Sequence, residues 1–195
     1  MLTKAEGAKR ASFMRVLAVL MVLMLSSLFT YVVTVNLQRP GGAFPVRFHY
    51  TVEVWIKRAG TSEWEFLTRT HNVFTKIGQD WVRDALGSAP ASDVAKYISL
   101  SAGNGSAPTA DWVLLPTPEL TGTLARHAGT YTATGTGSWT IEWTFTSDAT
   151  VTIVDTGLHW AASGSGNMIA AAALSPTASL ASGDSLKITW SNSVS

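Results

Sequence analysis

The stretch that decides the fold is residues 46–58, VRFHYTVEVWIKR, whose side chains alternate between apolar and polar. The apolar positions are Val46, Phe48, Tyr50, Val52, Val54 and Ile56, and the positions between them carry Arg, His, Thr, Glu, Trp and Lys. A period of two is typical of a β-strand with one face buried and the other in solvent. We therefore expect a long, half-buried strand here.

Similar patterns follow on the C-terminal side. Ala59-Gly60-Thr61-Ser62 predicts a turn, and the returning residues make 46–74 a candidate hairpin. Further strands are expected near 97–101, 139–146, 151–154, 156–160, 168–174 and 186–190, with Asp155-Thr156-Gly157 as one of the turns between them. Eight or nine short strands at this spacing predict a mainly β fold, an antiparallel β-sandwich or jelly roll.

Residues 75–87, TKIGQDWVRDALG, break the period of two and place apolar residues at helical spacing. Thr75 is the expected N-cap and Gly87 the expected stop. We expect one short helix over a sheet edge or barrel mouth. The Pro- and Gly-rich residues 101–118 predict a long surface loop.

On the N-terminal side, twenty residues from Val16 to Val35, VLAVLMVLMLSSLFTYVVTV, contain no charge. As a helix they would extend about 30 Å, the thickness of a bilayer's hydrocarbon core. Four basic residues against Glu6 give the first fifteen residues a charge of +3. Because positive flanks stay in the cytoplasm, we expect a cytoplasmic N-terminus and an exported C-terminal part.

The predicted organisation is a basic N-terminus (1–15), a transmembrane helix (16–35), a Pro/Gly linker (36–45) and one extracellular β-domain (46–195). The alternative is a removable signal peptide, whose cleavage site would be Gly41-Gly42-Ala43. Residues 16–35 are longer than the 7–15 apolar residues of such a peptide, which favours an uncleaved anchor.

Composition excludes several classes of protein. With a net charge of +1 in total and +3 in the first fifteen residues, the remainder carries −2 and has no basic stripe for nucleic acid. The chain has no cysteine, so disulfides, iron–sulfur clusters, thiolate zinc sites and a Cys nucleophile are excluded. We expect no cofactor.

From residue 70 onward the sequence also resembles a known type of domain. The segments that carry the resemblance are THNVFTKIGQDWVRDALG (70–87), KYISLSAGNGSAP (96–108), TGTLARHAGTYT (121–132), WTIEWTFTSDATVTIVDTGLHW (139–160) and MIAAAALSPTASLASGDSLKITW (168–190). They resemble β-sandwich domains of tail-fibre-type virion proteins and of archaeal and bacterial surface or filament proteins. The resemblance implies a structural or adhesive role and transfers no catalytic residue.

The layout as a whole is similar to that of archaeal type IV pilins, which have a basic N-terminus, one hydrophobic helix and a Thr-rich β-domain. Prepilins are cut at a small residue directly before the apolar run, where this chain has Arg15. The similarity implies a pilin-like role, with the usual processing position missing.

Three residues are candidates for interaction or modification. Trp55 falls on the polar face of its strand and Trp64 opens the next one, so both could stack on a sugar or on a neighbouring subunit. The alternative for Trp55 is burial under the 75–87 helix or at a sheet edge. Trp139, Trp143 and Trp190 are expected in the core. Asn104-Gly105-Ser106 is an N-glycosylation acceptor sequence in the expected surface loop.

The titratable residues show no catalytic spacing. His49, His71, His127 and His159 lie near many serines, but no nucleophile elbow accompanies them. Strand alternation places His159 toward solvent or a loop. Glu53 and Glu142 are on polar strand faces with nothing that brings them together as a glycosidase pair. No His or calcium-loop spacing indicates a metal, apart from isolated Asp155 and Asp184 in expected turns.

These observations predict a non-enzymatic structural subunit of a cell-surface filament, pilus-like or envelope appendage. We expect it in the cell envelope, assembling into a homopolymer through strand edges or its hydrophobic helix. Two alternatives remain: a virion structural protein, tail-fibre-like or membrane-embedded, and a carbohydrate-binding surface adhesin.

Overall fold

The computed structural model describes residues 48–87, 94–103, 106–115 and 119–194 of the 195-residue chain. All of them belong to the unit Arg47–Ser195. The predicted basic N-terminus, transmembrane helix and linker lie outside the described residues, as does Asn104. Within the described ranges, no helix combines the length and apolar character needed to cross a bilayer.

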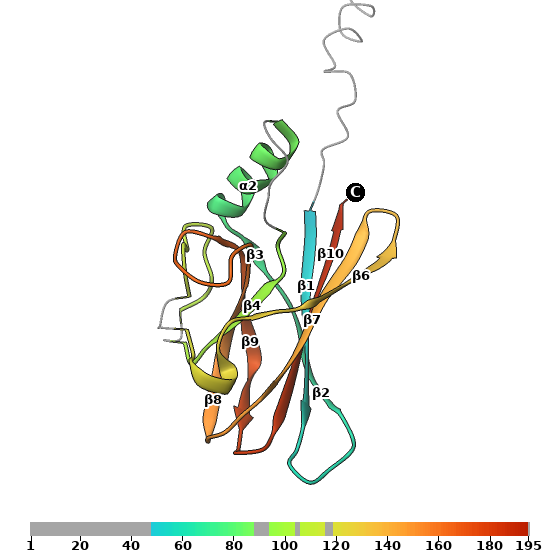
Figure 1. The fold of residues 1–195 in the computed structure, drawn as a ribbon, viewed down its shortest axis with the longest axis vertical. Coiled ribbons are helices and arrows are strands. Elements are labelled where there is room, and N and C mark those ends of the chain that lie inside the picture. Colours follow the sequence, from blue (N-terminus) through green and yellow to red (C-terminus); the bar gives the residue numbers. More distant parts are fainter. Residues whose placement is uncertain (1–47, 88–93, 104–105, 116–118, 195) are drawn as a thin grey trace, which may run out of the picture. The chain divides into compact units, whose positions relative to one another are not determined.

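The described residues form two antiparallel sheets that pack face to face as a β-sandwich, accompanied by one α-helix (Figure 1). This confirms the predicted mainly β sandwich. In order across the sheet, sheet A consists of β2 (Glu65–His71), β1 (Phe48–Lys57), β10 (Ser185–Val194), β7 (Ser138–Thr146) and β6 (Thr130–Gly135). Sheet B consists of β3 (Val73–Phe74), β9 (Met168–Leu180), β8 (Val151–His159), β4 (Tyr97–Ser101) and β5 (His127–Ala128).

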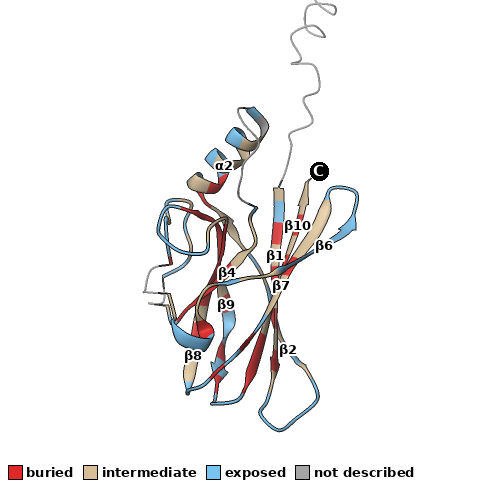
Figure 2. Ribbon diagram, viewed as in Figure 1, coloured by how far each residue is buried: buried red, intermediate tan, exposed pale blue. Residues whose placement is uncertain are grey.

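The alternation in β1 is confirmed, because Val52, Val54 and Ile56 are at most 2% exposed while the residues between them are half-buried. β1 lies between β2 and β10 and pairs with β10 along its whole length, from Phe48 opposite Val194 onward. The facing strands carry most of the buried residues, whereas the turns at both ends are exposed (Figure 2). Burial of each large aliphatic side chain contributes about 1.5–3 kcal/mol.

The three tryptophans expected in the core differ in burial. Trp190 is fully buried on β10, as predicted. Trp139 and Trp143 are half-buried and pack against the margin of the core. Trp143 is covered by the imidazole of His127, whose ring stacks on the indole at a centroid distance of 3.6 Å.

The predicted helix is α2 (Lys76–Gly87), and Thr75 is its N-cap as expected. The Thr75 Oγ1 accepts a hydrogen bond from the Gly78 N–H at 2.9 Å. The helix packs against β9, at the end of the sandwich that also contains the first residues of β1 (Figure 1). Trp81 stacks on Trp160 at a centroid distance of 6.4 Å, so the apolar face of α2 joins the main core.

The prediction of two strands separated by a turn at Asp155 is wrong, because β8 runs unbroken from Val151 to His159. A register shift between Ile153 and Asp155 takes the place of the turn. Gly157 serves close packing, since a Cβ there would lie 2.8 Å from the Nε2 of His159 and 2.9 Å from the Oγ of Ser99.

The described residues of the expected surface loop 101–118 are a mostly exposed loop after Ser101, as predicted, and they also add a partial third layer. Residues 106–115 of this loop pack on the outer face of sheet B, where Leu115 contacts a buried cluster with Met168 and Ala171. Two backbone hydrogen bonds fix it: Lys76 N–H to Ala110 O at 2.8 Å, and Gly166 N–H to Val113 O at 3.1 Å. Part of the outer face of sheet B is therefore covered, although Thr152 and Ser179 remain exposed, whereas the described residues leave that of sheet A open to solvent.

Candidate functional site

The two tryptophans predicted as interaction residues lie together on the outer face of sheet A, in an aromatic–lysine cluster formed by Trp55, Trp64, Phe66, Lys57 and Lys187. The rings of Trp55 and Phe66 meet edge to face at 5.1 Å, and Phe66 is 51% exposed. The Lys187 Nζ lies 5.6 Å from the Trp55 ring centroid and 5.2 Å from that of Trp64. The Lys57 Nζ lies 5.3 Å from the Trp64 centroid.

The position of the cluster excludes one alternative for Trp55, burial under the 75–87 helix. Helix α2 lies at the opposite end of the sandwich from the β1–β2 turn, near which the cluster sits (Figure 1). Trp55 is therefore not covered by the helix. The two ammonium groups lie within cation–π distance of the indole rings. An aromatic surface combined with positive charge is suited to contact an apolar surface that carries carboxylates.

Glu53 and Glu142 are both on the open face of sheet A, each opposite Thr189 on the intervening strand β10. Arg69 donates from its Nε to Glu53 at 2.9 Å, and the Thr189 hydroxyl donates to Glu142 at 2.7 Å. Two strand spacings separate the two backbones by about 10 Å. Each carboxylate is held by its own neighbour, so the structure does not assemble them into a shared site.

The prediction of a solvent-facing His159 is wrong, because His159 is fully buried. Its Nε2 lies 2.8 Å from the Oγ of Ser99, and its Nδ1 lies 2.8 Å from the Oδ1 of Asn167. Burial, reinforced by the nearby charge of Arg126, lowers the pKa of His159 to about 3. The ring is therefore neutral at physiological pH; with Nδ1 donating to Asn167, Nε2 accepts from the Ser99 hydroxyl.

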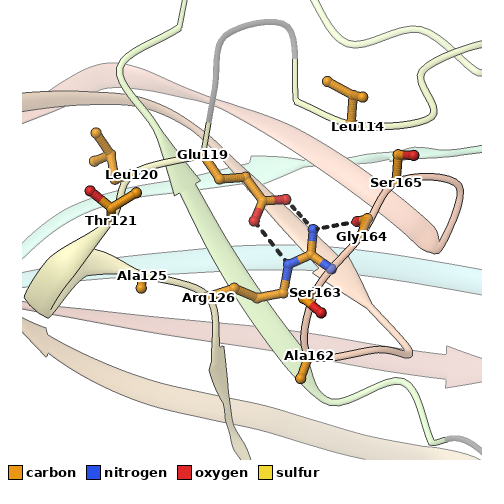
Figure 3. A pocket seen from close by; sticks show the side chains of 10 residues that line it. All are labelled: Leu114, Glu119, Leu120, Thr121, Ala125, Arg126, Ala162, Ser163, Gly164 and Ser165. Atoms are coloured by element: carbon orange, nitrogen blue, oxygen red, sulfur yellow. Dashed lines mark hydrogen bonds and ion pairs between the residues drawn. The ribbon is translucent and has the colours of Figure 1, made fainter.

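Arg126 extends this network to the surface. Figure 3 shows its guanidinium facing the Glu119 carboxylate in a shallow pocket of about 430 Å³, with further contact to Gly164. The Arg126 Nε donates to Glu119 at 2.9 Å, and Nη2 forms the second arm of this bidentate pair. Nη1 donates to Asn167 Oδ1 and to Ala161 O, both at 2.9 Å. Every guanidinium nitrogen is engaged, so Arg126 joins residues 119–126 to the 161–167 turn.

The order Ser99, His159, Asn167 has the hydrogen-bond pattern of a nucleophile, its base and the group that orients the base. However, Ser99 and His159 are both 0% exposed, and Ser99 lies within the paired strand β4. A substrate cannot reach the hydroxyl in this arrangement. The network connects strands β4 and β8 of sheet B to residues 119–126 and 161–167.

Asp155 is also buried, contrary to the prediction of a turn residue. Neither of its carboxylate oxygens has a hydrogen-bond partner, and desolvation raises its pKa to about 6. Gly103 passes close to it, since a Cβ at Gly103 would lie 2.8 Å from Oδ2. In the described ranges, no three His, Asp or Glu side chains are grouped to hold a metal ion.

Sequence reasoning missed Ser99, Glu119, Arg126 and Asn167. These residues lie far apart in the chain and carry no spacing that would have marked them as a network.

Comparison with known proteins finds no matching family model, no matching curated protein and no matching solved structure. The resemblances to surface, virion and pilin proteins therefore rest on the sequence segments alone.

Proposed function

We propose that this chain is a non-enzymatic structural subunit of a cell-surface filament or envelope appendage, and that its exported β-sandwich assembles through the free edge of sheet A. The predicted anchor at residues 16–35 would hold it in the membrane. A tail-fibre-like or membrane-embedded virion protein is the alternative with the same physical requirements.

The observation that carries the proposal is the edge strand β6. It pairs only with β7 among the described strands, and all six of its residues, TYTATG, are exposed. Edge strands of monomeric proteins are usually blunted by charged residues, prolines or bulges. β6 has no charged residue and no proline, and its register shift is confined to Ala133–Gly135. Thr130–Ala133 therefore offers unpaired backbone groups to another strand.

The open face of sheet A supports the same proposal. It combines threonine and serine side chains with the aromatic–lysine cluster, so a neighbouring subunit could contact both the edge and the face. A carbohydrate-binding adhesin is the second candidate, favoured by the exposed rings. A sugar that stacks on the same indole faces as Lys57 and Lys187 would have to displace their ammonium groups. This displacement makes assembly the better-supported function.

Cysteine cross-linking tests the proposal. Because the native chain has no cysteine, only the introduced residue can react. We expect a Thr132→Cys variant of the full chain, in membranes and treated with a short bis-maleimide, to give covalent dimers, the largest product that one cysteine per chain allows. Thr152→Cys is the matched control, because Thr152 is also exposed but lies on β8 of sheet B. Equal, low cross-linking of both variants would contradict assembly through β6.

A further inference from the structure

A cavity of about 570 Å³ lies at the α2 end of the sandwich. Its walls include four aromatic side chains: Tyr50 of β1, Trp81 of α2, Tyr131 of β6 and Trp139 of β7. Both sheets and the helix therefore contribute to it. Its volume falls in the range of 300–1,000 Å³ that is typical of small-molecule sites.

Two polar atoms of residues that line this cavity have no hydrogen-bond partner. Asn192 is only 3% exposed; its Nδ2 donates to Trp190 O at 3.2 Å, but its Oδ1 has none. The indole Nε1 of Trp81 is also buried without a partner. An unpartnered buried polar atom costs about 1–3 kcal/mol, so two of them at one cavity are unusual in a native protein. Both would be satisfied by a ligand that offers an acceptor and a donor.

The charges at the cavity narrow the class of ligand. Among the described residues of the cavity wall, Lys96 is the one with a charged side chain, and its Nζ lies over the ring of Tyr97 at 5.6 Å. Burial raises the pKa of Tyr50, so its phenol stays neutral. The other described wall residues are apolar or aromatic except Asn192, and the Lys96 ammonium already faces the Tyr97 ring. These features favour a neutral ligand with a hydrocarbon body.

We propose that this cavity binds a neutral amphiphile with a hydrocarbon body and a hydroxyl end, the hydroxyl accepting from Trp81 Nε1 and donating to Asn192 Oδ1. A hydroxyl is the smallest group that can do both. A free alkyl alcohol and the hydroxyl end of a lipid share this chemistry. The site does not depend on whether the chain assembles through β6.

The test uses the full chain in lipid nanodiscs with ¹⁵N-labelled tryptophan, in which the eight indole N–H groups give separate NMR signals. A Trp81→Phe variant assigns the Trp81 signal. We expect hexan-1-ol to shift this signal downfield and saturably, and the binding of hexane, which lacks the hydroxyl, to be about tenfold weaker. A monoacylglycerol probe, added in the same way, shows whether a lipid hydroxyl also enters.

Variants locate the site. Ala95→Phe and Val94→Phe add bulk at the cavity wall, and Val94 is 64% exposed, so the second variant leaves folding unaffected. Both should abolish the shift, whereas the size-matched Ala162→Phe, at the separate pocket beside Arg126, should not. Asn192→Leu should weaken hexanol about tenfold and leave hexane unchanged. Equal binding of hexanol and hexane, or a shift that survives Val94→Phe, would overturn the proposal.

Discussion

Replacing Arg126 by methionine is expected to lower the free energy of unfolding by about 3–5 kcal/mol. The Arg126 side chain is 5% exposed and joins Glu119, Asn167 and two backbone carbonyls. Methionine fills much of the same volume but leaves the carbonyls and the Glu119 carboxylate without their donor. Urea unfolding of the full chain, followed by tryptophan fluorescence, measures the loss.

The matched control for this prediction is Arg83→Met on α2. Arg83 also forms ion pairs, with Asp80 and Asp84, but its side chain is 66% exposed. Exposed pairs contribute about 0–1 kcal/mol, so this variant should unfold almost like the wild type. A double variant, Arg126→Met with Glu119→Gln, should recover part of the loss, because it removes the carboxylate left unpaired. Similar losses for Arg126→Met and Arg83→Met would refute the role given to the network.

The second large effect is a loss of stability in acid that originates at His159. Its folded-state pKa of about 3 lies below the ordinary value of 6.5. Between pH 6.5 and 3, His159 is therefore protonated in the unfolded chain but neutral in the folded chain. The free energy of unfolding therefore falls by about 1.4 kcal/mol per pH unit between pH 6.5 and 3, on the order of 5 kcal/mol in all. Above pH 6.5 this contribution is constant.

Asp155 has the opposite effect on how the free energy of unfolding depends on pH. Its pKa is raised from 3.8 to about 6, so the folded chain binds the proton more tightly and gains stability as the pH falls from 6 to 4. The two groups nearly cancel in that window, which hides the effect of His159 in the wild type. Asp155→Asn removes the opposing slope, and at neutral pH it also removes the penalty of a buried, unpartnered carboxylate.

The comparison that isolates His159 is between Asp155→Asn and the double variant Asp155→Asn/His159→Gln. Other carboxylates, such as Asp184, whose pKa is lowered by the N–H groups of Ala181 and Ala59, act equally in both variants and drop out of the difference. We expect the difference in unfolding free energy to be constant above pH 6.5 and to shift by about 1.4 kcal/mol per unit below it. Parallel curves from pH 7 to 4 would show that His159 titrates normally.

The strands and the helix could be predicted because local periodicity encodes them. Residues 46–58 keep a period of two over thirteen positions, and 75–87 combine helical spacing with a capping threonine; both match the structure. Trp55 and Trp64 were also found from alternation and chain order, and the structure brings them together through Lys187.

The loop at 101–118 was predicted, but its packing on sheet B was not, because its anchors Trp112 and Leu115 lie in a Pro- and Gly-rich run without any period. Alternation alone exposes His159, but Asn167 and Arg126, which no local pattern marks, bond to its ring or lie beside it in the buried network. The Asp-Thr-Gly sequence at 155–157 has the composition of a turn, yet its glycine is required by close packing inside a strand. Both the packing of the loop and the extended conformation of residues 155–157 depend on contacts between residues far apart in the sequence.

The central claim, that the β-sandwich is displayed outside the cell on a membrane anchor, is tested most directly by labelling single cysteines with a membrane-impermeant maleimide. Ser62→Cys is in the exposed β1–β2 turn, and Ala5→Cys is in the predicted cytoplasmic N-terminus. In intact cells that express the full chain, we expect Ser62→Cys to be labelled at once and Ala5→Cys only after permeabilisation. Labelling of Ser62→Cys only after permeabilisation would contradict the account.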